Sequence, residues 1–191
     1  MNDILVLVAF FFFIALFIVG LLWLLVPAMY GLPSRPTSPD RIRAALKLAN
    51  LKPDEVLYDL GSGDGRVLII AAREFGARAV GIEIGPVQRA FSWLRVYYSG
   101  IRHEVRIEAG NFYKSDLREA DVVFIYATST EVAKLASHLE KQMKSGSRLI
   151  SISADFPEWE PSMVDNHDLI FVYEMPPKQG SWTTYLLKQT K

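Results

Sequence analysis

Two acidic residues and a run of glycines have the types and spacing to hold a small polar cofactor. Asp59 follows apolar residues, and Gly61, Gly63 and Gly65 then come at every second position. Glycine is needed where the backbone takes a positive φ or where a ligand approaches it closely. Such a turn, at the carboxyl end of a strand in an open α/β sheet, is where a nucleotide-like cofactor binds. We therefore expect the cofactor-binding residues to include Asp59, Gly61, Ser62, Gly63 and Gly65.

The glycine spacing does not fit a phosphate-containing cofactor. The dinucleotide pattern Gly-x-Gly-x-x-Gly needs a glycine at position 66, where this chain has Arg66, and Gly65 comes one residue early. The phosphate-loop pattern that ends in Gly-Lys-Ser/Thr is also absent. A dehydrogenase is therefore a distant alternative.

Further polar and aromatic residues at strand ends fit a ligand with an amino-acid end, a ribose and an adenine. Asp59 can pair with an ammonium group, and Glu83, 24 residues later, suits the two hydroxyls of a ribose. Asn111 and Phe112 can hydrogen-bond and stack an adenine. Glu83 alone would be an ordinary surface acid, and Phe112 is equally compatible with the core. Together the residues predict S-adenosyl-L-methionine as the cofactor.

The elements that must position these residues alternate between strands and helices. Alternation of this kind predicts βαβ units and a parallel sheet. The last two expected strands have no helix between them and should form an antiparallel hairpin. We therefore expect an α/β fold, a Rossmann-like seven-stranded mostly parallel sheet with a C-terminal antiparallel hairpin. The expected strands are 56–60, 79–84, 105–108, 121–126, 148–153, 169–174 and 182–188, and the expected helices are 38–50, 66–75, 86–99 and 131–143.

One transmembrane helix is expected before this domain. Residues 4–26 are uncharged and almost wholly apolar, a run of 23 residues. At about 1.5 Å per residue, such a helix spans a hydrocarbon core of about 30 Å. A cleaved signal peptide is the alternative, but no basic residue precedes the run and no small-x-small cleavage site follows it. We expect a transmembrane anchor over 1–30, a Pro-rich linker over 31–37 and the catalytic domain over 38–191.

Charges that flank the apolar run predict its orientation. Four basic residues follow the run within about twenty positions, whereas only Asp3 and the terminal amine precede it. The positive-inside rule then keeps the domain on the cytoplasmic side, or in the matrix at the mitochondrial inner membrane if the protein is eukaryotic. The basic residues are Arg35, Arg41, Arg43 and Lys47.

The overall composition argues against nucleic-acid and metal partners. Lys and Arg total 21 and Asp and Glu total 21, so the chain lacks the basic excess typical of nucleic-acid binding. The chain has no cysteine, which excludes thiolate metal sites and a cysteine nucleophile. The three histidines, His103, His138 and His167, show no metal-ligand spacing. We expect no metal.

The glycine turn, Glu83 on the next strand and the closing hairpin together resemble the class I, seven-β-strand S-adenosylmethionine-dependent methyltransferases. A narrower similarity rests on four motifs, Pro36-Thr37, residues 59–66, Asp116-Leu117 and residues 156–161. In these motifs the chain is similar to the protein-lysine methyltransferases that modify the c subunit of the ATP synthase and the adenine nucleotide translocase, and to their prokaryotic relatives. This resemblance implies a membrane-directing segment and places Pro36 and Thr37 near the methionine end of the cofactor or the acceptor channel.

The acceptor site is expected near the end of the fourth strand. That segment, Tyr126-Ala127-Thr128-Ser129, lacks the Asn/Asp-Pro-Pro-aromatic motif of adenine and amide N-methyltransferases. Thr37, Tyr126 and Thr128 are the acceptor-site candidates, although the pattern slightly favours interpreting Tyr126 as a buried strand-end tyrosine. Residues 156–161 are interpreted as a substrate-side loop or, alternatively, as a rigid turn that covers the sheet edge.

These observations predict a membrane-anchored methyltransferase that acts on lysine side chains of membrane proteins. One alternative is a methyltransferase of a lipid, a quinone or another small apolar molecule reached from the bilayer. Another is a non-catalytic membrane module that keeps the fold and binds the cofactor or a partner.

Overall fold

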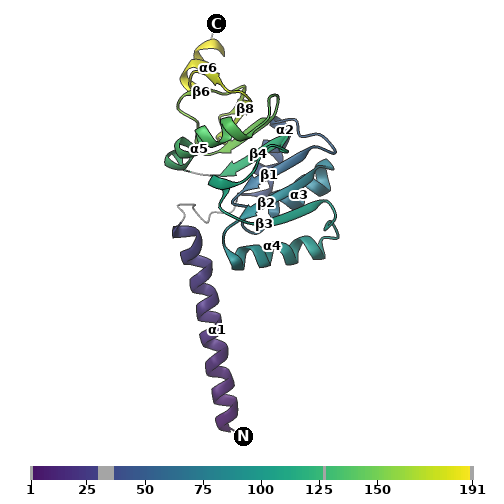
Figure 1. Cartoon of the computed structure of the whole chain (residues 1–191), viewed down its shortest axis with the longest axis vertical. Coiled ribbons are helices and arrows are strands. Elements are labelled where there is room, and N and C mark those ends of the chain that lie inside the picture. The colour runs from purple at the N-terminus through teal and green to yellow at the C-terminus, as the bar shows by residue number, and fades with distance from the viewer. Residues whose placement is uncertain (1, 30–36, 127, 190–191) are drawn as a thin grey trace.

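The computed structural model of the chain describes residues 2–29, 37–126 and 128–189 (Figure 1). Its first element, α1 (Asn2–Met29), extends away from the α/β domain that the other elements form. The segment Asp3–Trp23 of α1 is long and apolar enough to cross a membrane, and none of its most apolar part is buried. A signal sequence near the N-terminus meets the same criteria of length and composition.

Seven strands form one mixed sheet in the order β3-β2-β1-β4-β5-β8-β7. The first five strands run parallel, whereas β8 is antiparallel to both β5 and β7. Because the chain turns outward in opposite directions from β1 and β4, the carboxyl ends of these strands form the switch point where α/β folds bind ligands. The strands are β1 (Val56–Leu60), β2 (Arg78–Glu83), β3 (Val105–Ala109), β4 (Val122–Tyr126), β5 (Arg148–Ile152), β7 (Met163–Asp165) and β8 (Ile170–Glu174).

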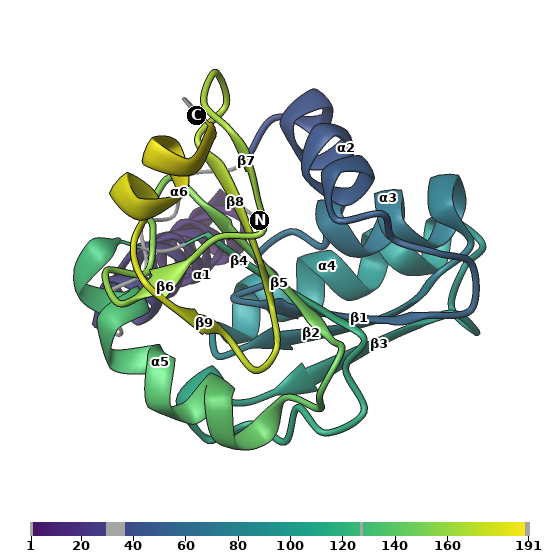
Figure 2. The same ribbon diagram turned by 90° about the horizontal axis from the view of Figure 1, so that it is seen from above.

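Helices cover both faces of the sheet (Figure 2). On one face lie α2 (Pro39–Leu48), α3 (Arg66–Phe75) and α4 (Pro86–Tyr98). On the other face lies α5 (Ser129–Gln142). The predicted bounds of β1 and α3 are confirmed, because an apolar run followed by glycines marks both the end of the strand and the start of the helix.

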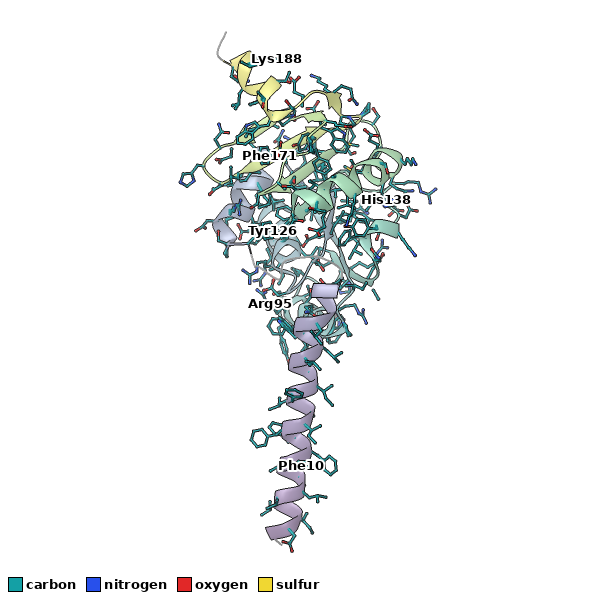
Figure 3. All side chains as sticks on the ribbon, turned by 90° about the vertical axis from the view of Figure 1, so that its left-hand side faces the viewer. Phe10, Arg95, Tyr126, His138, Phe171 and Lys188 are labelled. Atoms are coloured by element: carbon teal, nitrogen blue, oxygen red, sulfur yellow. The ribbon has the colours of Figure 1, made fainter. Side chains whose placement is uncertain are left out.

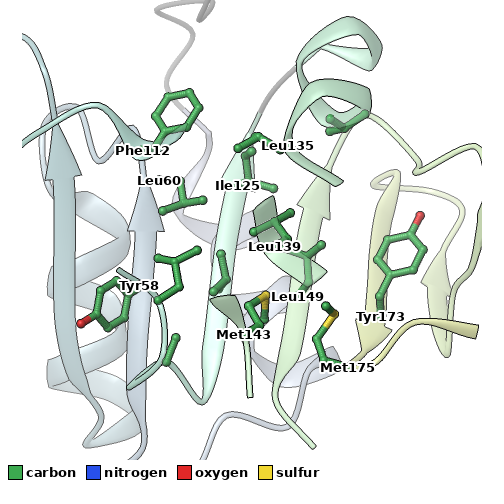
Figure 4. Close-up of a cluster of buried hydrophobic side chains, with 14 of the residues drawn as sticks. Tyr58, Leu60, Phe112, Ile125, Leu135, Leu139, Met143, Leu149, Tyr173 and Met175 are labelled. Atoms are coloured by element: carbon green, nitrogen blue, oxygen red, sulfur yellow. The ribbon is translucent and has the colours of Figure 1, made fainter. Parts of the chain in front are cut away.

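Successive residues of the central strand pack into two different cores. Tyr58 and Leu60 belong to a cluster with α5, which Figure 4 shows, whereas Leu57 packs with α2 and α3. Alternation of side chains along a strand therefore places Asp59 on the α3 side of the sheet. Its carboxyl group lies beneath the glycine turn rather than against α5.

The C-terminal part of the chain corrects one prediction. Residues 182–188 are not a strand but lie in the helix α6 (Trp182–Gln189), and the antiparallel hairpin consists of β7 and β8 instead. Aromatic and β-branched residues suggested a strand, yet Trp182 and Tyr185 have helical spacing. The Ser181 Oγ also accepts a hydrogen bond from the Thr184 backbone N–H at 3.2 Å and so caps the helix. A short strand pair, β6 (Trp159–Glu160) and β9 (Lys178–Gln179), was not predicted.

Candidate cofactor-binding and active site

The glycine turn after β1 has the backbone conformation that its sequence predicts. The φ angles of Gly61, Gly63 and Gly65 are +86°, +53° and +75°. The N–H groups of Gly61 and Ser62 donate to the Ile82 carbonyl at 2.9 and 3.1 Å, which ties the turn to the end of β2. All three glycines therefore hold conformations that side chains with a Cβ rarely adopt.

Glu83 connects this turn to the next one. It is the last residue of β2, and its side chain is buried. One carboxylate oxygen accepts from the Gly63 N–H at 2.8 Å and the other from the Gly85 N–H at 2.7 Å. Each carboxylate oxygen has two lone pairs, so both can still accept a hydroxyl hydrogen. The geometry is compatible with the predicted contact to a ribose, and that contact stays a prediction.

Asp59 is a buried acid whose charge is not compensated. Its side chain is 4% exposed, and among the residues that the structure describes none donates a hydrogen bond to its carboxyl group. Burial, together with the negative charges of Glu83 and Asp64, raises the pKa of Asp59 well above its ordinary value. A bound cation would lower that pKa again, because an opposite charge favours the carboxylate.

The third acid of the turn, Asp64, is neutralised within the protein. Burial opposes its charge, but hydrogen bonds from Arg66 and the charges of Arg66 and Arg95 outweigh this effect and lower the pKa of Asp64. Arg66 forms a bidentate pair with it at 2.7 and 2.9 Å, and Arg95 from α4 approaches to 2.5 Å. Sequence reasoning missed this cluster, although the Asp64-x-Arg66 spacing was a visible signal.

The charges at the turn decide which class of cofactor fits. Because Asp64 is paired with two arginines, Asp59 and Glu83 are the buried acids at the turn that have no cationic partner among the described residues. They suit a ligand with a sulfonium and an ammonium group, and they would repel a pyrophosphate. The donor set thus fits S-adenosylmethionine, and the predicted contacts of Asp59 with a positive group and of Glu83 with the ribose are compatible with it.

Buried polar atoms of α4 also surround the turn. A Cβ at Gly65 would lie 2.2 Å from the Ser92 Oγ, so α4 packs directly against the turn. The Oγ atoms of Ser62 and Ser92 and the Oε1 of Gln88 have no hydrogen-bond partner within the described part of the chain. The sequence carried little signal for Ser92 and Gln88, because two polar residues on an inward helix face contradict the usual pattern.

The two predicted adenine contacts lie at the same edge of the sheet. Asn111 caps the short helix η1 (Phe112–Lys114), with its Oδ1 accepting from the Tyr113 N–H at 3.0 Å. This leaves the Asn111 amide nitrogen as a donor. Phe112 is 4% exposed and belongs to the core cluster, and Figure 4 shows it beyond Leu60, past the arrowheads of the strands. Its stacking on adenine stays a prediction.

The acceptor-site candidates occupy two places at this edge. Thr37 is buried, and its carbonyl accepts from Arg66 at 3.0 Å, so it lies beside the glycine turn. Tyr126 ends β4, half-buried near the middle of the domain (Figure 3), with its ring 6.0 Å from the Arg41 guanidinium. Thr128 caps α5 together with Glu131 in a capping box. The predicted position Pro36 lies outside the described residues.

The predicted substrate-side loop is mostly core. Phe156 and Trp159 are buried and stack with ring centroids 4.3 Å apart. The Phe156 N–H donates to the Tyr173 hydroxyl at 2.9 Å. Only Pro157 and Glu158 at the tip are exposed. The alternative interpretation, a rigid turn that covers the sheet edge, describes the aromatic residues better.

Comparison with known proteins decides the family. The profile of the ANTKMT methyltransferase domain matches residues 59–163, more than half of the chain and all of the parallel sheet from Asp59 onward. The chain belongs to this family. It is an S-adenosylmethionine-dependent methyltransferase, and the resemblance seen in its motifs is confirmed.

Individual relatives of this methyltransferase cover much of its length. A protein-lysine N-methyltransferase of Saccharolobus islandicus is 34% identical over 133 residues, 69% of this chain and 83% of that protein. The lysine N-methyltransferase of the ATP synthase c subunit from Xenopus laevis is 27% identical and aligns with 75% of this chain but only 64% of its own length. A crystal structure of an RNA methyltransferase from Salinibacter ruber with S-adenosyl-L-homocysteine superposes with a TM-score of 0.73, at 34% identity, over 76% of this chain and 97% of that one.

Proposed function

We propose that this methyltransferase is anchored in a membrane by α1 and N-methylates lysine side chains of membrane proteins. The observation that carries the proposal is the pair of buried acids without a cationic partner among the described residues, Asp59 and Glu83, at a glycine turn in a chain of this family. Relatives act on lysine, among them one named for the c subunit of the ATP synthase. An anchor would raise the effective concentration of membrane substrates without any new contact.

The proposed division of the chain is an anchor over 1–30, a linker over 31–37 and a catalytic domain over 38–191. The basic residues after the span support a cytoplasmic domain, since Arg41, Arg43 and Lys47 all lie in α2, close to the linker. If the protein is mitochondrial, the same reasoning places the domain in the matrix.

The residues of the turn would hold the cofactor, and the edge beside it would hold the acceptor. When bound, S-adenosylmethionine supplies a methyl group on a positively charged sulfur. Asp59 would pair with a positive group of the cofactor, and Glu83, Asn111 and Phe112 would orient its ribose and adenine. The chain must then hold a neutral lysine amine in line with that methyl group.

The acceptor lysine must lose its proton before transfer. An apolar environment lowers the pKa of an ammonium group, and the core residues at the carboxyl edge provide such surroundings. Thr37 and Tyr126 would offer oxygen atoms that orient the amine. Both residues lie near the glycine turn, which supports this assignment. The Thr37 carbonyl accepts a hydrogen bond from Arg66, and Tyr126 ends β4, which pairs with β1.

Cofactor binding tests the site assignment. Titration calorimetry with S-adenosylmethionine should show at least about a tenfold loss of affinity for Asp59→Ala, because a charged pair is worth about 1.5–3 kcal/mol. Gly61→Arg should abolish binding, because the side chain would fill the turn. The control is Asp40→Ala, whose carboxylate is 96% exposed and pairs only with Arg43 in the described structure. Unchanged binding in both turn variants would overturn the assignment.

Product analysis tests the acceptor class. Membranes incubated with the enzyme and methyl-labelled cofactor should carry the label in protein, and peptide mass spectrometry should find methylated lysines that are absent with Asp59→Ala. Label in the lipid extract would instead favour a small apolar acceptor. Label in RNA would favour the activity of the Salinibacter relative. Intact cofactor binding without any product would favour a non-catalytic module.

A further inference from the structure

The helix α4 buries polar residues and exposes apolar ones, the reverse of an ordinary surface helix. Its buried residues Gln88, Ser92 and Val96 follow one another at a spacing of four and face the domain. Its most exposed residues are apolar or aromatic, and none of them carries a charge. A typical surface helix buries its apolar stripe and exposes charged residues. The exposed fractions on the outward face are 45% for Phe91, 56% for Trp93, 44% for Leu94, 47% for Tyr97 and 82% for Tyr98.

These outward residues form one continuous patch. Phe91, Leu94 and Tyr98 follow each other at helical spacings of three and four, so they lie side by side. Trp93 and Tyr97 stack with ring centroids 5.4 Å apart, and Tyr97 also contacts Tyr98. A contiguous exposed apolar patch on a soluble domain indicates an interaction surface.

The N-terminal half of α4 contacts the end of the apolar helix α1. The Gln88 Nε2 donates to the Trp23 carbonyl at 2.7 Å. The rings of Trp23 and Phe91 meet edge to face at 6.0 Å. Trp23 closes the segment Asp3–Trp23 that could span a membrane. The apolar patch therefore begins where that segment ends.

The direction of α4 fits a membrane surface. Figure 1 shows α4 lying across the direction of α1, at the edge of the domain nearest to it. Figure 3 shows Arg95 of α4 near the domain end of α1, whereas Phe10 lies far out on α1. If α1 crosses a bilayer, α4 lies roughly in the plane of its surface. Trp and Tyr are enriched at this depth because their rings are both apolar and polar.

We propose that the outward face of α4 binds the lipid headgroup region as a second, in-plane membrane contact. The occupant is the bilayer in which α1 is anchored, so this inference rests on the proposed anchor. Amphipathic helices bury such faces about 5–10 Å into the interface. The aromatic patch, its lack of charge and its continuity with Trp23 all favour lipid as the occupant.

This contact would fix the position of the cofactor site relative to the membrane. The inner face of the same helix presses Ser92 against Gly65, and its Arg95 pairs with Asp64. One rigid helix thus has the bilayer on one side and the glycine turn on the other. The domain is then held in a defined orientation relative to the bilayer.

The absence of cysteine from the chain allows a direct test with single spin labels. Nitroxides would be attached to Tyr98→Cys, Leu94→Cys, Phe12→Cys and Leu187→Cys in the full chain, reconstituted in phosphatidylcholine and phosphatidylglycerol vesicles. Tyr98 and Leu187 are both well exposed, but Leu187 lies on α6 at the opposite end of the domain. Accessibility to oxygen and to a water-soluble nickel chelate is then measured by power saturation.

A label at position 98 or 94 should show an oxygen-to-nickel accessibility ratio at least about threefold above that at 187, because it lies inside the interface. An aqueous ratio at both positions, with the label at Phe12 in the bilayer, would overturn this inference and leave the anchor intact. An aqueous label at Phe12 would overturn the anchor as well. Dipolar broadening at position 98 that disappears on dilution with unlabelled protein would assign the patch to a second copy of the chain and overturn the lipid contact.

Discussion

Two helices begin at the same edge of the sheet, after the neighbouring strands β1 and β4, and each has a buried acid nearby. At the start of α5, Glu131 is 7% exposed and its carboxylate accepts from the Thr128 N–H at 3.0 Å, which completes a capping box. At the start of α3, the N-cap is Gly65, without a side-chain cap, and Asp59 is 4% exposed without a hydrogen-bond donor among the described residues.

The difference distinguishes an acid with a structural hydrogen bond from one that we propose to be functional. A buried charged group without a partner destabilises the fold, whereas a buried group with its hydrogen bonds made does not. Glu131 makes its hydrogen bonds in the free protein, whereas the ionised form of Asp59 would become favourable only beside a bound cation. Unpaired buried acids at a cleft are candidates for binding and catalysis for this reason.

The largest effect should come from filling the space between the glycine turn and α4. Gly65→Ala places a methyl group against the Ser92 Oγ, whereas Gly100→Ala, at nearly the same φ of +74°, meets nothing within 4 Å. Both changes should cost about 1–2 kcal/mol of backbone strain. Gly65→Ala should lose about 1–3 kcal/mol more from overpacking, and it should lose cofactor binding. Equal unfolding free energies by urea denaturation would contradict the close packing of α4 on the turn.

The next largest effect should distinguish Glu83 from Glu131, the two carboxylates that accept hydrogen bonds from backbone N–H groups. Glu83→Gln replaces one charged acceptor by an amide N–H₂ that faces an N–H, so cofactor affinity should fall about 10–100-fold. Glu131→Gln, the same change at the other turn, should leave cofactor affinity unchanged. Isothermal titration of both variants measures this. A loss of the same size in both would mean that Glu83 has only a structural role.

Asp59→Asn should stabilise the free protein at neutral pH by about 0.5–2 kcal/mol. Folded Asp59 keeps its proton at pH values where the unfolded chain has lost it, so the stability of the free protein falls as the pH rises from the ordinary value of 3.8 to the raised pKa. The Asn variant should not lose stability in this way, and thermal unfolding of both proteins from pH 4 to pH 8 measures the difference.

Cofactor affinity of the wild type should weaken as the pH falls, because protonated Asp59 cannot pair with a cation. A pH-independent affinity would exclude Asp59 from the cation contact.

The smallest effect should come from the cap of α5. Thr128→Ala removes the side-chain cap and should cost about 1 kcal/mol of stability, while Thr128→Ser keeps it. If Thr128 acts only as the cap, methyl transfer by the fully folded Ala variant should match that of the wild type. A lower kcat/KM that serine restores would instead support the predicted place of Thr128 in the acceptor site.

The sequence by itself determined the glycine turn and the strands around it. An apolar run, an acid and alternating glycines leave few local conformations, and Glu83 at the end of the next strand follows from the βαβ repeat. The cap of α2 is also local, because the Ser38 Oγ accepts a hydrogen bond from the Arg41 N–H at 3.3 Å, three residues along the chain. These features depend on residues close together in the chain.

Only the tertiary structure decided the features that depend on packing between distant segments. Residues 182–188 have β propensity, but they form a helix whose Trp182 packs edge to face on Phe171 of β8. The pairing of Arg95 with Asp64 and the outward aromatic face of α4 likewise follow from where the helix lies. Long-range contacts override local propensity because they contribute more free energy than the few tenths of a kcal/mol that separate propensities per residue.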